Sequence, residues 1–226
     1  IMISFLIPSH NYGKYLIRCV DSILKNNPKF IKEIVIVNDS SEDNTDEVAT
    51  KIRKQRKKIK YFKKNFKNLS KTMNFAIKKT EGNVICKIDP DDQIKKNFAE
   101  ILGKKFFELK ADFLYSDFIV RDKSTKKEKI KNQKVHPFLK KLMYPHGSGC
   151  LYNKKIWKEV KGYNEKIFYQ DDYDFWLKIL NKKKFKINYL SEALYIYNIH
   201  GSNMSKNIIN KNVTKLKILL TNLFKL

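Results

Sequence analysis

The chain has 226 residues, enough for one large domain, or a domain with a small appendage, around a real hydrophobic core. Its 42% hydrophobic and 13% aromatic content excludes a disordered chain, and no run approaches the 18 consecutive apolar residues of a membrane span. The formal net charge is +25, but the lysines are spread over the whole length. This even distribution favours a genome-wide bias in composition as the source of the charge, and the charge could also attract the protein to an anionic membrane surface. No nucleic-acid-binding motif accompanies it, which argues against nucleic acid as the partner.

The cysteines indicate a reducing compartment. Cys19, Cys86 and Cys150 are isolated in apolar contexts, which is typical of reduced core thiols in a cytoplasmic protein. Since a strand-like run begins at Met2, we expect no signal peptide. The expected location is therefore the cytoplasm, with peripheral contact at the inner face of the membrane as a further use of the basic surface.

Apolar runs alternate with amphipathic segments through the first half of the chain. The runs predict strands over 2–7, 31–37, 60–62 and 83–88, and the segments predict helices over 15–24, 44–57, 69–79 and 93–109. This alternation is typical of βαβ units around a parallel sheet. Ligands bind such sheets beyond the carboxyl ends of the strands, so the polar loops 8–12, 38–41 and 89–92 predict the site.

The acidic turn Asp89-Pro90-Asp91-Asp92 follows the run 83–88. Three carboxylates held this close repel one another unless a cation sits among them. Hard oxygen ligands in a tight cluster suit Mg²⁺ or Mn²⁺, usually shared with substrate phosphates. The alternative interpretation is a solvated Asp-rich turn.

The second half has a less regular pattern. It predicts strands over 112–120, 150–152, 185–190 and 193–197, short helices over 138–143 and 154–160, and a longer helix opened by the acidic segment 168–177. Residues 121–134 form a charged segment that is hairpin-like or mobile, and 199–203 form a loop. Residues 207–226 predict a lysine-bearing helix with one apolar side, which packs on the domain, binds a partner or lies on a membrane.

Five segments, in order, carry a family resemblance. They are Leu6-Ile7-Pro8-Ser9-His10-Asn11, Ile36-Val37-Asn38-Asp39-Ser40-Ser41, Asp89-Pro90-Asp91-Asp92, Gly162-Tyr163 with Gln170–Trp176, and Tyr197-Asn198-Ile199-His200-Gly201-Ser202-Asn203. Together they resemble a family 2 glycosyltransferase with the GT-A fold over residues 2–205. The implied fold is α/β, with a Rossmann-like, mostly parallel central sheet flanked by helices and a C-terminal acceptor-side subregion.

For the donor, the resemblance implies a nucleotide-diphosphate sugar, with a UDP-sugar favoured. It implies that Asp39 accepts a hydrogen bond from the base, with His10 against the base's face and Pro8 shaping that wall. Asn11 belongs to the same turn, and Lys71 is a candidate for the positive charge near the donor. The alternative for His10 is an ordinary turn residue.

For the metal, the resemblance implies that Asp91 is the ligand of Mn²⁺ or Mg²⁺. Asp89 or Asp92 then contacts the ribose or the metal, and spacing does not decide between these two neighbours. The alternatives for His200 are a metal or donor-phosphate role and a surface loop.

For the reaction, the resemblance implies a single displacement that inverts the sugar's configuration. Asp172 corresponds to the general base and Asp171 to its acidic neighbour. The alternative is that both are first-turn helix acids, which are favourable near the helix dipole.

The predicted organisation is a glycosyltransferase domain over 1–205, followed by the amphipathic helix 206–226. Residues 1–110 form the nucleotide-sugar-binding half, and 111–205 form the acceptor and catalytic-base half. The expected acceptor is a hydroxyl of a glycan or of a lipid-linked molecule, such as an intermediate of bacterial surface polysaccharide synthesis. Two alternatives stay open: a non-catalytic nucleotide-binding module of this fold, and a nucleotidyltransferase on a similar sheet.

Overall fold

Four parallel strands form the first part of the sheet in the computed structural model, which describes residues 1–201 and 208–223. They are β1 (Ile3–Ser9), β2 (Ile31–Asp39), β3 (Ile59–Lys64) and β4 (Val84–Lys87), and their spatial order is β3-β2-β1-β4. The apolar runs are buried on both faces, as parallel strands covered by helices require. Their carboxyl ends therefore meet at one edge of the sheet.

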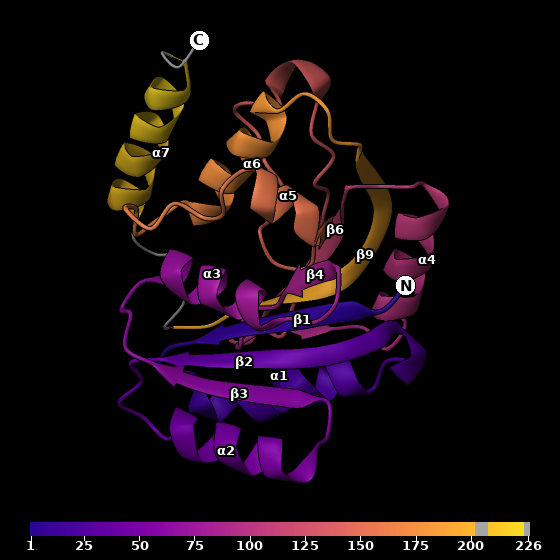
Figure 1. Ribbon diagram of the computed structural model, residues 1–226, viewed down its shortest axis with the longest axis vertical. Coiled ribbons are helices and arrows are strands. Elements are labelled where there is room, and N and C mark those ends of the chain that lie inside the picture. Colours follow the sequence, from indigo (N-terminus) through magenta and orange to yellow (C-terminus); the bar gives the residue numbers. More distant parts are fainter. Residues whose placement is uncertain (202–207, 224–226) are drawn as a thin grey trace.

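Helices cover both faces of these strands (Figure 1). The helices α1 (Gly13–Leu24), α2 (Thr45–Gln55) and α4 (Phe98–Glu108) pack against one core cluster, and α3 (Leu69–Lys79) packs against the other. Alternate residues of β1 divide between the two cores, with Phe5 in the first and Leu6 in the second. A short 3₁₀ helix, Pro28–Phe30, precedes β2.

The second half extends the same sheet. The strands β5 (Gln93–Ile94), β6 (Phe113–Asp122), β8 (Leu151–Asn153) and β9 (Ile187–Ile199) continue it in the order β4-β8-β6-β9-β5, and β7 (Glu128–Lys131) pairs with β6. The pairs β6–β9, β1–β2, β2–β3 and β1–β4 are parallel, whereas β8, β5 and β7 pair antiparallel. Helices α5 (Lys154–Glu159) and α6 (Asp171–Asn181) pack on the second core. The predicted α/β class, with its Rossmann-like and mostly parallel sheet, is confirmed.

Several predicted boundaries were wrong. The helix predicted over 93–109 begins at Phe98, because Gln93 and Ile94 pair with β9. The two strands predicted over 185–190 and 193–197 are one strand, β9, whose register with β6 shifts near Ser116. The helix predicted over 138–143 is a 3₁₀ turn at Pro137–Leu139. For the charged segment 121–134, by contrast, the hairpin-like alternative is confirmed, because β7 pairs antiparallel with β6.

The last helix, α7 (Ile208–Leu223), agrees with the prediction over 207–226 where the structure describes it. The remaining positions of that prediction, and the loop residues Ser202 and Asn203, lie outside the described residues. Ile218 is buried, whereas Val213, Leu216 and Leu220 are exposed. Within 1–201 and 208–223, no helix combines the length and the apolar character needed to cross a bilayer.

Candidate functional site

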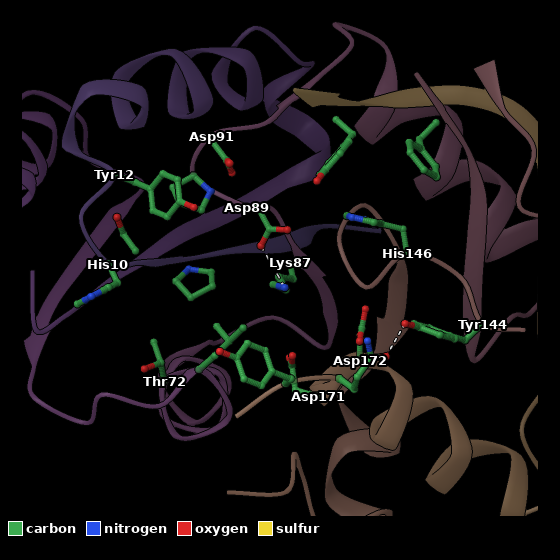
Figure 2. Close-up of a pocket in the computed structure, with 18 of the residues that line it drawn as sticks. His10, Tyr12, Thr72, Lys87, Asp89, Asp91, Tyr144, His146, Asp171 and Asp172 are labelled. Carbon is green, nitrogen blue, oxygen red and sulfur yellow. Dashed lines mark hydrogen bonds and ion pairs between the residues drawn. The ribbon is translucent and has the colours of Figure 1, made fainter. Parts of the chain in front are cut away.

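A cavity of about 1070 Å³ opens where β1, β2 and β4 end (Figure 2). The three predicted loops all contribute to it. Of the predicted site residues, the cavity is lined by Pro8, His10, Asp39, Asp89, Asp91, Asp171 and Asp172. Four others that the structure describes, Asn11, Lys71, Asp92 and His200, lie outside this lining. Figure 2 shows Asp89 and Asp91 on one wall, with Asp171 and Asp172 on the opposite wall.

Asp89 is the member of the acidic turn that is held toward the centre of the cavity. Its Oδ1 lies 3.0 Å from the Lys87 ammonium, and its Oδ2 accepts a hydrogen bond of 2.6 Å from the Ser148 hydroxyl. Burial acts to raise the pKa of Asp89, but the charge of Lys87 and these hydrogen bonds hold it below its usual value. Asp89 is therefore ionised at neutral pH.

Asp92 is directed into the fold instead. It is 1% exposed, and it accepts hydrogen bonds from the Tyr195 hydroxyl and, at 2.7 Å, from the Asn198 amide. Burial, followed by the charges of Asp89 and Asp91, raises the pKa of Asp92 to about 8. Of the two neighbours that spacing could not separate, Asp89 is the one that faces the cavity.

Asp91 contacts His200. Its Oδ2 lies 2.9 Å from the His200 Nε2, and the Asp91 carbonyl accepts hydrogen bonds from Arg18 at 2.8 Å and from Asn198 at 2.9 Å. Burial and the nearby charge of Asp89 raise the pKa of Asp91. A divalent cation would relieve this unfavourable charge, and a carboxylate with an imidazole is a donor set that Mn²⁺ accepts.

In residues 1–201 and 208–223, no three His, Cys, Asp or Glu side chains converge as a metal site. Asp91 and His200 could therefore hold a cation only together with ligands from elsewhere, such as substrate phosphates and water.

Asp39 holds the loop that follows β3. Its carboxylate accepts hydrogen bonds from the amides of Phe66 at 2.6 Å, Lys67 at 2.9 Å and Asn68 at 3.1 Å, and from the Thr72 hydroxyl at 2.7 Å. A further bond of 2.9 Å comes from the Ser40 hydroxyl. A carboxylate has about four lone-pair positions, so most of its accepting capacity is used within the protein.

The loops after β1 and β2 are joined to each other. The His10 Nδ1 lies 2.7 Å from the Asp39 carbonyl, and the Asn11 Oδ1 accepts a hydrogen bond of 2.8 Å from the Glu42 amide. Asn11 has a φ of 60°, a left-handed conformation that asparagine tolerates better than most residues. Lys71 is exposed at the start of α3.

Asp171 and Asp172 begin α6 on the wall opposite the acidic turn. The Asp172 Oδ1 accepts a hydrogen bond of 2.8 Å from the Tyr173 amide. A Cβ added to Gly147 would lie 2.6 Å from the Asp172 Cβ, so glycine at this position lets the start of α6 approach the loop before β8. Burial raises the pKa of Asp171 to about 6, with Lys87 opposing this rise and Asp172 adding to it.

Sequence reasoning missed the middle of the cavity. Lys87, Tyr144 and His146 line it, Ser148 donates a hydrogen bond to Asp89, and none of the four was predicted. The rings of Phe118, Tyr195 and Tyr197 surround His146 at centroid distances of 5.3, 5.5 and 5.3 Å, and burial lowers its pKa. One signal was available: Lys87 is a charged residue in an otherwise apolar strand.

Comparison with known proteins gives a consistent result. Residues 4–161 match the family model of glycosyl transferase family 2. The chain is 26% identical to glycosyltransferase GlyA of Streptococcus pneumoniae and 28% identical to chondroitin synthase of Pasteurella multocida, over 90% of its length in each case. It spans only 31% and 21% of those longer proteins.

Among solved structures, Staphylococcus aureus TarS residues 1–349 in complex with UDP-GlcNAc has a TM-score of 0.76 with this chain. The match covers 100% of this chain and 67% of that one, at 20% identity. At this identity the likeness concerns the fold, and it confirms the predicted GT-A arrangement.

Proposed function

The chain belongs to glycosyl transferase family 2, and from that premise we propose that it transfers a sugar from a nucleotide-diphosphate sugar to a hydroxyl of a glycan or lipid-linked acceptor. One observation carries the proposal. The acidic turn with Asp91 and the carboxylate pair Asp171–Asp172 face each other across a single cavity, which supplies a place for a donor and a base on the far side of it. UDP is the favoured nucleotide, because TarS, which shares the fold, was solved with UDP-GlcNAc.

The donor half, residues 1–110, would hold the nucleotide at the ends of β1, β2 and β4. His10 and Pro8 line the cavity and would contact the nucleotide base. Asp39 would act mainly by fixing residues 66–68 beside the base, since five protein donors already occupy its carboxylate. Asp89 faces inward and would contact the ribose.

A divalent metal, Mn²⁺ or Mg²⁺, would be held by Asp91 and His200 and, when bound, would offset the negative charge of the leaving diphosphate. The chain's own contribution is to present these two side chains in fixed positions. Arg18 and Asn198 hold the Asp91 backbone carbonyl, and the aromatic ring of Tyr15 lies 4.8 Å from the His200 ring.

The acceptor half, residues 111–205, would supply the base. The acceptor oxygen forms a bond to the anomeric carbon as the bond from that carbon to the diphosphate breaks, and Asp172 takes the hydroxyl proton. The nucleoside diphosphate leaves with the electron pair of the broken bond. Attack from the face opposite the leaving group inverts the configuration, so no covalent sugar–enzyme intermediate is needed.

Thermal stabilisation by UDP, GDP, dTDP and CDP, each with Mn²⁺ and with EDTA, tests the donor site. We expect a metal-dependent rise in Tm for UDP that Asp91→Ala abolishes and Asp172→Asn retains. Asp122→Ala, at the end of β6 and away from the cavity lining, is the matched control and should behave as wild type.

Product analysis then separates the alternatives. Transfer or hydrolysis releases the nucleoside diphosphate, whereas a nucleotidyltransferase reaction releases or consumes pyrophosphate. UDP binding without turnover of any nucleotide sugar would support a non-catalytic module. No Tm shift with any nucleotide would refute the donor site.

We further propose peripheral membrane contact through α7, in keeping with a lipid-linked acceptor of bacterial surface polysaccharide synthesis. Val213, Leu216 and Leu220 are exposed with helical spacing, on a chain of net charge +25. In flotation with vesicles of anionic lipid, the triple variant with serine at these three positions should float less than wild type. Equal flotation of both would exclude this role for the helix.

A further inference from the structure

Lys87 is a buried cation between the two acidic walls. It ends β4, a strand whose other residues are apolar, and it is 7% exposed. Its ammonium lies 3.0 Å from the Asp89 Oδ1. Burial acts to lower the pKa of Lys87, but the carboxylates of Asp89, Asp171 and Asp172 raise it above its usual value, so the side chain stays charged.

Burial disfavours negative charge on Asp171, whereas the Tyr173 amide favours it on Asp172 by donating a hydrogen bond to the Asp172 Oδ1. The Asp171 Oδ2 is buried and accepts no hydrogen bond from the described residues. The titratable groups that face the pair are Lys87 and Asp89 from β4 and its turn, Tyr144 and Cys150 from the segment before β8, Tyr163 after α5, and the two carboxyls themselves. Among these groups, Lys87 supplies the positive charge.

Figure 2 shows Lys87 below Asp89 and above Asp171 and Asp172, with the ion pair to Asp89 drawn. Asp89 also accepts the hydrogen bond from Ser148, so the ammonium is paired with a carboxylate that a second contact holds in place. A buried cation kept in place in this way costs desolvation free energy, which the surrounding acids offset.

We propose that Lys87 is a positioning residue for the transfer reaction, whose ammonium, fixed by Asp89, keeps the Asp171–Asp172 pair in its ionised, proton-accepting form. The inference rests on the proposed function, in which Asp172 is the base. It assigns a task to a residue that neither the proposed metal site nor the nucleotide contacts use.

The test compares Lys87→Gln, Lys87→Arg and Lys96→Met in the full chain. Glutamine keeps a hydrogen-bond donor for Asp89 but removes the charge, whereas arginine keeps the charge. Lys96 is exposed before α4 and serves as the control. The readouts are kcat against pH for UDP release from the UDP-sugar that the wild type uses, the UDP dissociation constant, and the titration of the carboxyl ¹³C resonances of Asp171 and Asp172.

Without the charge of Lys87, the pKa of the proposed base, Asp172, should rise, and kcat at pH 7 should fall. The loss should be about tenfold for each unit by which that pKa exceeds the assay pH. The acid limb of the Lys87→Gln profile should move to higher pH, while the UDP dissociation constant stays within about threefold of wild type. Lys87→Arg should keep most of the activity and the wild-type limb.

An unchanged acid limb and unchanged carboxyl titration in a folded Lys87→Gln protein would overturn the inference. So would a loss of activity in Lys87→Arg as large as in Lys87→Gln, because the charge would then not be the deciding property. If the wild type turns over no nucleotide sugar, the proposed function fails, and the carboxyl titration still decides whether Lys87 keeps the pair ionised.

Discussion

Replacing Asp39 with alanine should cost more stability than any other single change at the nucleotide end of the cavity. The carboxylate is 6% exposed and accepts the amides of Phe66, Lys67 and Asn68 together with the Thr72 hydroxyl. Each donor that loses this charged acceptor should lower the free energy of unfolding by about 1–1.5 kcal/mol, because water from the cavity can replace the lost hydrogen bond only in part. The four donors together therefore amount to about 4–6 kcal/mol.

This loss is a large share of the free energy of unfolding, which is only about 5–15 kcal/mol for a typical domain. The loss should also depend on pH. Burial acts to raise the pKa of Asp39, but the Thr72 hydroxyl and the amides of Lys67 and Asn68 bring it below the ordinary value of 3.8. A carboxyl with a lowered folded-state pKa stabilises the protein above its unfolded-state value, and this contribution disappears as the pH falls through the lowered value.

Urea unfolding followed by far-ultraviolet circular dichroism, at pH 7 and at pH 3, measures both effects. Glu42→Ala is the matched control, because it removes a carboxylate from the same loop without releasing residues 66–68. A loss below about 1 kcal/mol in Asp39→Ala at pH 7 would refute the reasoning, since the amides would then find equivalent partners elsewhere. At pH 3 the difference between Asp39→Ala and wild type should be smaller than at pH 7.

Three further predictions concern Asp171 and Asp172 at the start of α6 and Gly147 beside them. Asp172→Asn should lower kcat about 10²–10⁴-fold with little change in UDP affinity, and an equal loss in UDP binding by calorimetry would argue for a donor-binding role instead. Gly147→Ala should lower kcat at least about tenfold, since the added Cβ would lie 2.6 Å from the Asp172 Cβ; wild-type kcat in a folded variant would show that the base position is not critical. Asp171→Asn should raise the free energy of unfolding by about 1–3 kcal/mol at pH 7.5 and by much less at pH 3.5. The sign follows because the folded-state pKa of Asp171 is raised from 3.8 to about 6, so the folded state loses stability as the pH rises through that window; equal stabilities of variant and wild type at pH 7.5 would contradict it.

Local sequence pattern was enough to predict the α/β class and the edge of the sheet where the cavity lies. Apolar runs such as 31–37 and amphipathic segments such as 69–79 predict strands and helices from residues that are close in sequence. The alternation of strands and helices predicts a parallel sheet, and in such a sheet the loops after the strands meet at one edge. The orientation of Asp92 did not follow from local pattern, because its partners Tyr195 and Asn198 lie 103 and 106 residues further on.

Lys87 and His146 escaped prediction for different reasons. A lysine at the end of a strand is ordinarily solvated, so only the arrival of Asp171 and Asp172 from α6 makes Lys87 a buried counter-ion. The position of His146 depends on rings from β6 and β9, which are distant in sequence. The hydrogen bonds from residues 66–68 to Asp39 likewise could not be predicted from local sequence, because they depend on the pairing of β3 with β2.

β9 also sets an order of assembly during synthesis. A ribosome completes the acidic turn at residue 92 long before it delivers Tyr195, Asn198 and His200, which are separated from their partners in that turn by 103 to 109 residues. Until β9 pairs with β5 and β6, Asp91 and Asp92 lack these partners, so the turn stays hydrated in the nascent chain. Contacts this distant in sequence form late and slowly. A polypeptide ending near residue 110 therefore contains the donor half but lacks the residues that contact Asp91 and Asp92. The two halves are for this reason poor candidates for separate expression.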